Sequence, residues 1–554
     1  MNLVNSRQKK SWLLTGTILV GSAMVLAGIL AKDRVPKPRS FESLKADQAT
    51  VNKVAQEVDV VFAERWKGAG ITPARPAENL TVIRRLSQGL TATIPSIEEI
   101  RQLEKVSSEN QVEWWIARLL EDRRMSDHLA ERFARAYVGV EDGPFIVFRR
   151  HRFVSWLSDQ FIVNRPYDEI AHEIVASTGL WTDTPETNFV SVTSDPNKDG
   201  ALDPIKLAAK TSRSLLAMRI DCLECHDDFL GTIQLGEPDD VRGGEQIDFH
   251  HLAAFFGQVQ NSLAGIQDSK QDKPYEFRLL EDTEPSKIPP AVPYLEKLLP
   301  AEGTLRERLA KWITHPENKP FARATVNRLW AVMFGKPIIE PIDDIPWGQE
   351  LPRELEILAD DFIANNFDIH RTIRIIAATK SFKLESQYEG EVTVDHEKLL
   401  AVFPIIRLRP EQMAQALLQA TSLVTIDYSA GILNRLESFG RQNDFIQRFG
   451  DFGKDEFTAR GETVTQRLLL LNGDLIRERI NGNLLAPNKI AAVSPDEKKM
   501  AEVAFLACFT RYPTSEELNH FLTRIGESES KPKNEIVLDL FWAMFNSAEF
   551  GWSH

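Results

Sequence analysis

Apolar residues recur every three or four positions along most of the chain after residue 42, which is the spacing of an amphipathic helix. The stretch NQVEWWIARLLED is one example, since its apolar stripe consists of Val112, Trp115, Ile116, Leu119 and Leu120. The stretches RTIRIIAATKSF and PEQMAQALLQATSLV follow the same pattern. Alternating runs bounded by hairpin turns, which would signal strands, are scarce. The pattern therefore predicts a mainly α fold.

The first 35 residues break this pattern, because the 20 residues from Trp12 to Ala31 contain no charge. A helix of that length spans roughly 30 Å, the thickness of the hydrocarbon core of a bilayer. Basic residues precede it, among them Lys9 and Lys10, as in a signal sequence or signal anchor. We therefore expect residues 1–35 to form a membrane anchor or signal segment, with an uncleaved transmembrane helix as the favoured form.

Two changes in composition mark boundaries after that segment. A linker rich in Pro, Lys and Arg covers residues 32–42, and a second stretch rich in proline and charge covers residues 268–303. A chain of 554 residues is also too long for one hydrophobic core. We expect the N-terminal transmembrane helix to be followed by two helical domains, at 43–268 and 303–554.

The balance of charge limits the kinds of partner. The formal net charge is −14, which argues against nucleic acid, because a phosphate backbone is itself negative. Motifs of common enzymes are absent, including a GxSxG elbow, a phosphate-binding Walker loop and an HExxH zinc motif. Whether the protein is an enzyme is therefore left open by its sequence.

The stretch DCLECHDD is the most specific chemical signal. The chain has only three cysteines, and two of them, Cys222 and Cys225, directly precede His226 at the spacing that attaches a c-type haem. In such a site the cysteines form thioether bonds and the histidine ligates the iron. Two alternatives remain: the cysteines form a disulfide, or they bind zinc together with His250 or His251.

A haem iron also needs a sixth ligand or an open face. His250 and His251 are the candidates, either for that ligand or for zinc, because they begin the apolar stretch DFHHLAAFF. A capping or core role is the favoured interpretation of either histidine. The third cysteine, Cys508 in LACFTRYP, is predicted to be a buried apolar residue.

A second metal-binding pattern occurs in DPNKDGALDPIK. Its four oxygen-bearing residues fall on the first, third, fifth and ninth positions of a calcium loop: Asp195, Asn197, Asp199 and Asp203. The twelfth position should be a bidentate glutamate, and Lys206 occupies it. A polar surface turn is therefore the favoured interpretation, and a calcium site is the alternative.

Ordered matches over nearly all of the chain after the anchor carry a family resemblance. They include LLAMRIDCLECHD, RLRPEQMAQALL and TVTQRLLLLNG. The chain resembles a bacterial family best known from planctomycetes, in which a cytochrome-c-like domain precedes a C-terminal companion domain (domain-of-unknown-function families 1549 and 1553). The resemblance implies an exported, mostly helical protein with haem at Cys222, Cys225 and His226. A link to polysaccharide breakdown is implied by association only.

Two departures from the family pattern suggest a diverged member. The family continues after the haem motif with Asp-His-Pro, whereas Asp227, Asp228 and Phe229 stand here. The family's Pro-Pro-Ser-His-Pro-Glu-Leu-Leu stretch is replaced by PWGQELPRELEIL.

We therefore expect a c-type cytochrome-like protein, anchored in the inner membrane with its bulk in the periplasm. It would carry electrons or serve as a redox accessory to a partner enzyme. The alternative is a haem-free scaffold or interaction protein with a zinc or disulfide site. A metal-dependent hydrolase that uses the acidic and histidine side chains near the motif is a third reading.

Overall fold

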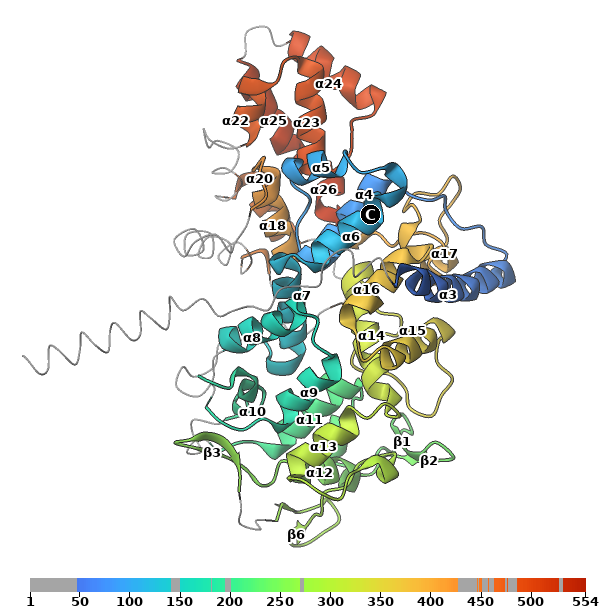
Figure 1. Ribbon diagram of the computed structural model, residues 1–554, viewed down its shortest axis with the longest axis vertical. Helices are drawn as coiled ribbons and strands as arrows, with labels where there is room; N and C mark the ends of the chain where they lie inside the picture. Colours follow the sequence, from blue (N-terminus) through green and yellow to red (C-terminus); the bar gives the residue numbers. More distant parts are fainter. Residues whose placement is uncertain are drawn as a thin grey trace, which may run out of the picture. The chain divides into compact units, whose positions relative to one another are not determined.

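The computed structural model describes residues 47–140, 150–180, 182–194, 201–269, 274–426, 446, 448–450, 457, 463–473, 476, 486–527 and 532–554. These residues are mainly helical (Figure 1), which confirms the helical part of the predicted fold class.

The helices of the first half are α3 (Gln48–Ala69), α4 (Asn79–Thr91), α5 (Ile97–Leu103), α6 (Gln111–Leu120), α7 (Arg123–Val138), α8 (Arg150–Ile162), α9 (Tyr167–Ala176), α10 (Asn188–Ser191), α11 (Pro204–Leu216) and α12 (Gln246–Ala254). Those of the second half are α13 (Leu305–Ile313), α14 (Lys319–Phe334), α15 (Arg353–Ala364), α16 (Ile369–Ala378), α17 (Val394–Lys398), α18 (Pro410–Ala420), α20 (Val464–Asn472), α22 (Ala486–Val493), α23 (Glu497–Phe509), α24 (Ser515–Glu527), α25 (Lys533–Phe545) and α26 (Ala548–Gly551).

Short 3₁₀ turns and two-stranded sheets connect these helices. The turns are η1 (Ser108–Asn110), η2 (Pro185–Thr187), η4 (Asp221–Glu224), η5 (Glu296–Leu298) and η6 (Ser381–Lys383). The antiparallel pairs are β1 (Gln234–Glu237) with β2 (Asp240–Gly243), β3 (Val259–Ser262) with β4 (Gly265–Asp268), β5 (Glu276–Phe277) with β6 (Ser286–Lys287), and β7 (Ile406–Arg407) with β8 (Trp552–Ser553).

The predicted transmembrane helix requires a correction. Across the part of the chain that is described, none of the helices combines the length and the apolar character that crossing a membrane requires. The longest, α3, has 22 residues but carries six charged side chains, so only one of its faces is buried. The segment on which the prediction rested, residues 1–35, lies outside the described residues.

Buried apolar side chains form two clusters. The larger draws its members from between Val51 and Phe403, and the smaller combines Ile94 with residues between Leu408 and Phe550. Tyr294 and Leu295 of the proline-rich stretch belong to the larger cluster, where the ring of Tyr294 packs on Trp312 at a centroid distance of 4.9 Å. Packing thus divides the described residues near 405, and the predicted folding units at 43–268 and 303–554 stay a prediction.

Two adjacent arginines of α4 join distant parts of the chain. Arg85 is 1% exposed, and its guanidinium donates to the backbone oxygens of Phe382, Leu384 and His554. Arg84, also 1% exposed, donates to the carbonyl of Cys508. Burial lowers the pKa of Arg85 to about 9 and that of Arg84 to about 10, because the charged form loses its hydration. Helix α4 therefore binds both the larger cluster and the C-terminal helices.

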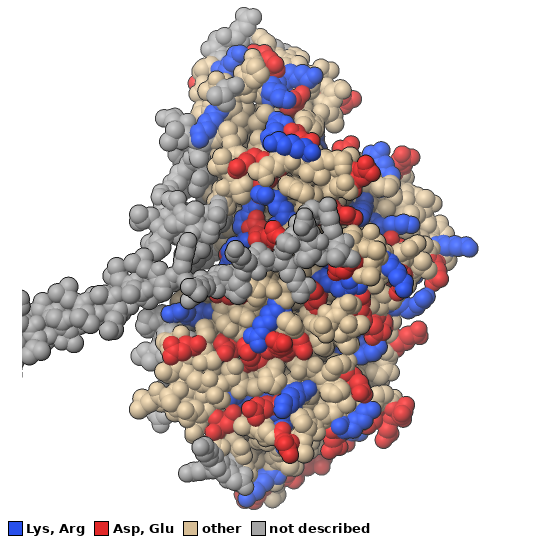
Figure 2. Space-filling model, viewed as in Figure 1, with Lys and Arg blue, Asp and Glu red and all other residues tan. Residues whose placement is uncertain are grey.

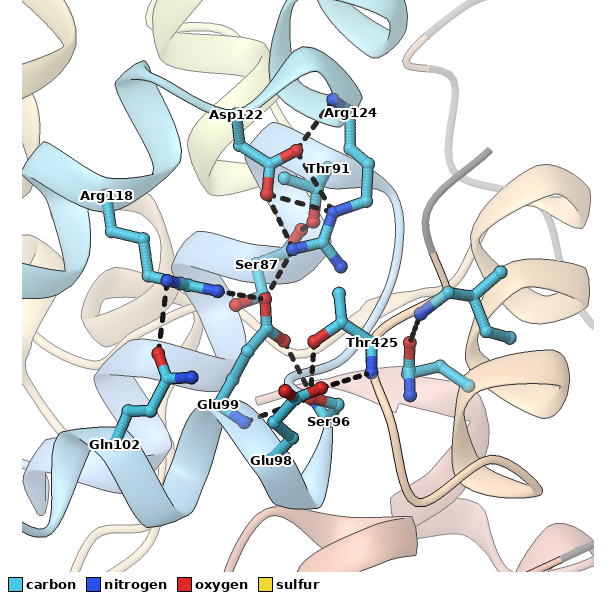
Figure 3. A network of polar contacts seen from close by, with 12 residues as sticks. Ser87, Thr91, Ser96, Glu98, Glu99, Gln102, Arg118, Asp122, Arg124 and Thr425 are labelled. Carbon is cyan, nitrogen blue, oxygen red and sulfur yellow. Dashed lines mark hydrogen bonds and ion pairs between the residues drawn. The ribbon is translucent and has the colours of Figure 1, made fainter. Parts of the chain in front are cut away.

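A polar network connects helices α5, α6 and α7 with the segment that follows α18 (Figure 3). Glu99 is 1% exposed; its carboxylate accepts from the backbone of Ser96 and pairs with Arg118 and Arg124. The neighbouring Glu98 accepts from the backbone N–H of Thr425 at 3.1 Å. One capping box thus connects α5, α6, α7 and residue 425.

Charged side chains of both signs are interspersed over the face drawn in Figure 2. Many charged side chains form ion pairs, for example the exposed Arg353 with Glu64 at 2.9 Å and the buried Arg306 with Asp268 at 2.7 Å. Exposed pairs of this kind contribute little stability, whereas Arg306 is fully buried and its pair fixes the β3–β4 hairpin to α13.

The arginine that ties α4 to the C-terminal part of the chain gives a stability prediction. Arg85→Met leaves three backbone oxygens without their donor, so we expect the free energy of unfolding to fall by about 3 kcal/mol. Urea denaturation followed by circular dichroism measures it. Arg75→Met is the matched control, since Arg75 is exposed, and an equal loss in both variants would contradict the assignment.

Candidate functional site: the Cys222–His226 loop

The loop that carries the cysteines follows α11 and begins with the turn η4. Within it Leu223 is fully buried, whereas Cys222, Cys225 and His226 are exposed. The buried leucine anchors the loop to the core, because burying its side chain stabilises that position by about 2 kcal/mol. The three residues of the predicted site are thus brought to one surface.

Both thiols are free and belong to one turn. The backbone N–H of Cys225 donates to the carbonyl of Cys222 at 3.4 Å, and the Cys222 thiol contacts the carbonyl of Arg219 at 3.8 Å. A turn of this kind brings its first and fourth Cα atoms within about 7 Å, which also suits a disulfide. The turn is therefore compatible with both uses of the sulfurs.

The ring of His226 has a defined tautomer. Its Nδ1 lies 2.6 Å from the carbonyl oxygen of Asp227, and because a carbonyl only accepts, Nδ1 carries the hydrogen. The lone pair of the neutral ring is then on Nε2, and no described residue forms a hydrogen bond with that atom. An Nδ1–H bonded to a carbonyl is the usual arrangement of a histidine that ligates a metal through Nε2.

Helix α12 holds the loop from beneath. The carbonyl oxygen of Glu224, between the two cysteines, accepts from His250 Nε2 and Gln246 Nε2, each at 3.0 Å. His250 Nδ1 then accepts from the hydroxyl of Tyr275 at 3.0 Å, since Nε2 already carries the hydrogen. His250 is fully buried, and burial lowers the pKa of its imidazole below the usual value.

The acidic residues beside the motif satisfy backbone donors. Asp227 accepts from the N–H of Gln246 at 2.7 Å and so caps α12. Asp228 accepts from the N–H groups of Leu230 and Ile233. These bonds, the one from Ile233 above all, lower the pKa of Asp228. Both carboxylates thus have structural partners, which does not favour the hydrolase reading.

Ion pairs connect the start of the loop with the second half of the chain. Arg213 pairs with Asp221 at 2.7 Å and with Asp343 at 3.1 Å, and Arg219 pairs with Asp343 at 2.6 Å. Burial opposes the ionisation of Asp221, but the hydrogen bonds and charge of Arg213 outweigh it and lower its pKa. The backbone N–H of Ile345 also donates to the carbonyl of Ala217 at 2.7 Å.

The two other predicted histidine ligands already have hydrogen-bond partners. His251 Nδ1 donates to the carbonyl of Pro289 at 2.6 Å, and both nitrogens of His250 are already hydrogen-bonded. In the described part of the chain, no three or more His, Cys, Asp or Glu side chains gather in a way that could hold a metal ion.

Little of the predicted calcium loop can be placed. Asp195, Asn197 and Asp199 lie outside the described residues. Asp203 is the N-cap of α11, where its carboxylate accepts from the N–H groups of Ile205 and Lys206 at 3.1 and 3.2 Å. The spacing of Asp203 is therefore explained by helix capping.

The third cysteine behaves as predicted. Cys508 is fully buried in α23, and burial raises the pKa of its thiol. Sequence reasoning missed Gln246 and Tyr275, which position the loop through backbone and histidine contacts. The only signal for Gln246 was its place at the start of an apolar helix, which says nothing of the oxygen that it binds.

Two regions of the chain match known families. Residues 57–261, which include the loop, match a family described as a protein of unknown function (DUF1549), and residues 305–431 match another described in the same words (DUF1553). These are the two domains named from the resemblance. No curated protein matches the chain, and no solved structure matches it. The cytochrome-c-like character and the divergence of this chain stay predictions.

The buried histidine beneath the loop gives a pH prediction. Because burial lowers its pKa, the unfolded chain binds a proton at His250 more readily than the folded chain does. The free energy of unfolding should therefore fall as the pH drops below about 6.5.

Urea denaturation at a series of pH values between about 4.5 and 7 measures this effect. His250→Gln should make the dependence on pH shallower, whereas the exposed His520→Gln should leave it as in the parent protein. Parallel curves for the parent and His250→Gln would contradict the assignment.

Proposed function

We propose that Cys222, Cys225 and His226 bind a haem covalently, and that the protein is an extracytoplasmic c-type cytochrome-like electron carrier or redox accessory of a partner enzyme. The observation that carries the proposal is the His226 ring. Its Nδ1–H is bonded to a carbonyl, its Nε2 has no hydrogen-bond partner among the described residues, and two free thiols stand on the same exposed loop.

The residues present fit a haem. Both thiols are exposed, so the vinyl groups of the macrocycle can reach them. Phe229 and Leu230 are 79% and 87% exposed beside His226, and the Phe229 ring stacks on the imidazole at a centroid distance of 5.8 Å. Exposed apolar side chains beside a prospective ligand are suited to border the edge of an apolar macrocycle while part of their surface stays exposed.

The chain's own residues would then set the properties of the site. The bond from His226 Nδ1–H to the Asp227 carbonyl fixes the orientation of the imidazole and increases the basicity of Nε2. The hydrogen bonds from His250 and Gln246 keep the spacing of the two sulfurs by holding the carbonyl between them. A bound haem supplies one-electron transfer.

A second candidate is a haem-free protein whose two thiols form a reversible disulfide. It is favoured by the hydrogen bond from the Cys225 N–H to the Cys222 carbonyl, which keeps the two residues in one turn. The two candidates exclude each other at any one time, because each needs both sulfurs.

Haem attachment is tested by expressing the full chain in a host with the machinery that attaches haem to exported proteins. We expect a peroxidase-stained band on a denaturing gel and a Soret absorption, both lost in Cys222→Ser/Cys225→Ser. The buried Cys508→Ser is the matched control and should keep the stain. Folded protein without stain and without Soret absorption would end the haem proposal.

Titration of thiols in the denatured protein separates the second candidate. Attached haem leaves one reactive thiol, Cys508, before and after reduction. A disulfide also leaves one before reduction but gives three after it, since the chain has three cysteines.

A further inference from the structure

The segment that carries the loop combines exposed apolar side chains with most of the chain's net negative charge. Residues 221–287 contain 15 Asp and Glu but only 5 Lys and Arg, which is a net charge of −10 out of −14 for the whole chain. Phe229, Leu230 and Leu280 are exposed apolar side chains of this segment, the last of them 67% exposed, and Val241 and Leu263 are exposed in its hairpins.

The apolar centre is held in place by specific bonds. The Asp228 carboxylate accepts from the N–H groups of Leu230 and Ile233 and from the hydroxyl of Thr232, and Gly231 has a φ of +68°, which a tight turn here requires. Phe229 and Leu230 are therefore exposed by a built turn and not by fraying.

Gln246 connects the two halves of this centre. Its backbone N–H binds the carboxylate of Asp227, its Nε2 binds the carbonyl of Glu224, and its Oε1 accepts from the N–H of Leu280 at 2.8 Å. The residues that follow Leu280, Glu281 and Asp282, are exposed. One side chain thus ties the cysteine loop to the acidic segment after β5.

Exposed acidic side chains are adjacent in sequence to the residues of that connection. Glu245 is exposed next to Gly244, whose carbonyl accepts from the Asp228 N–H at 2.9 Å. Glu276 is exposed between Tyr275, which bonds His250, and Phe277, whose ring stacks on His250 at 3.6 Å. We name Glu245, Glu276, Glu281 and Asp282 the acidic rim, and Phe229, Leu230 and Leu280 the apolar centre.

We propose that this surface docks an exported redox protein that presents an apolar patch surrounded by Lys and Arg. The inference rests on the proposed function, since the docked partner would exchange electrons at the cysteine loop. Complementary charges speed encounter and select orientation, while contact between apolar side chains at the centre holds the complex. A second copy of this chain is disfavoured, because two acidic rims would repel each other.

The experiment uses the full haem-loaded chain and mitochondrial cytochrome c, a basic redox protein, as the probe. Surface plasmon resonance at a series of salt concentrations should show saturable binding whose association rate falls as salt rises. Charge reversal at the rim, Glu245→Lys/Glu281→Lys, should reduce the association rate at least tenfold at low salt. Phe229→Ser/Leu230→Ser should instead raise the dissociation rate.

A matched double reversal away from the loop is the control. Glu109→Lys/Glu516→Lys changes the net charge by the same amount at two exposed positions of η1 and α24. An equal loss of association in this control would show that net charge alone attracts the probe and would overturn the docking surface. Unchanged binding of both the rim and the centre variants would overturn it as well.

Failure of docking and failure of haem attachment are distinguishable. Cys222→Ser/Cys225→Ser lacks haem but keeps both the rim and the centre, so it should still bind the probe with the same dependence on rim charges. If the parent protein carries haem but the rim variants bind the probe as the parent does, the docking surface is overturned and the haem proposal is not. Two further results would overturn the docking surface. One is binding of phosphatidylcholine vesicles through Phe229 and Leu230 in place of the probe. The other is a dimer of this chain that Phe229→Ser/Leu230→Ser abolishes.

Discussion

The carbonyl oxygen of Glu224, held between the side chains of His250 and Gln246, is the point on which the geometry of the candidate site depends. Glu224 lies between the two cysteines in the sequence, so its position determines how both thiol side chains project from the loop. A buried carbonyl without donors costs about 1–3 kcal/mol, and two donors on one helix make this conformation of the loop the favoured one. The tautomer of His250 and the bond to Tyr275 follow from the same contact.

The helices could be predicted from the sequence because a helix that packs on one face needs apolar residues at every third or fourth position. The stretch with Trp115 and Leu119 forms α6, and the stretch that begins at Pro410 forms α18, as their apolar spacing predicts. The roles of Arg84 and Arg85 could not be read, since their acceptors lie about 300 to 470 residues away and are backbone oxygens. The transmembrane prediction rested on one apolar run, and the described helices offer no such span.

For the candidate site, the sequence supplied the side chains but not their partners. Cys222, Cys225 and His226 lie on one exposed loop, and their binding of a haem stays a prediction. An aspartate has the same local chemistry as a helix cap and as a calcium ligand, so Asp203 could not be assigned from spacing. His250 was named as a candidate ligand, yet both of its ring nitrogens are hydrogen-bonded. Its partners, Glu224 and Tyr275, lie on other segments of the chain, so the sequence did not reveal them.

The intact mass of the denatured protein, after expression with haem-attachment machinery, tests the central claim most directly. Covalent attachment through Cys222 and Cys225 predicts a chain heavier by one haem, and the Cys222→Ser/Cys225→Ser variant at its bare polypeptide mass. A parent protein at the bare polypeptide mass, or lighter than it by the two hydrogens that a disulfide removes, would contradict the account.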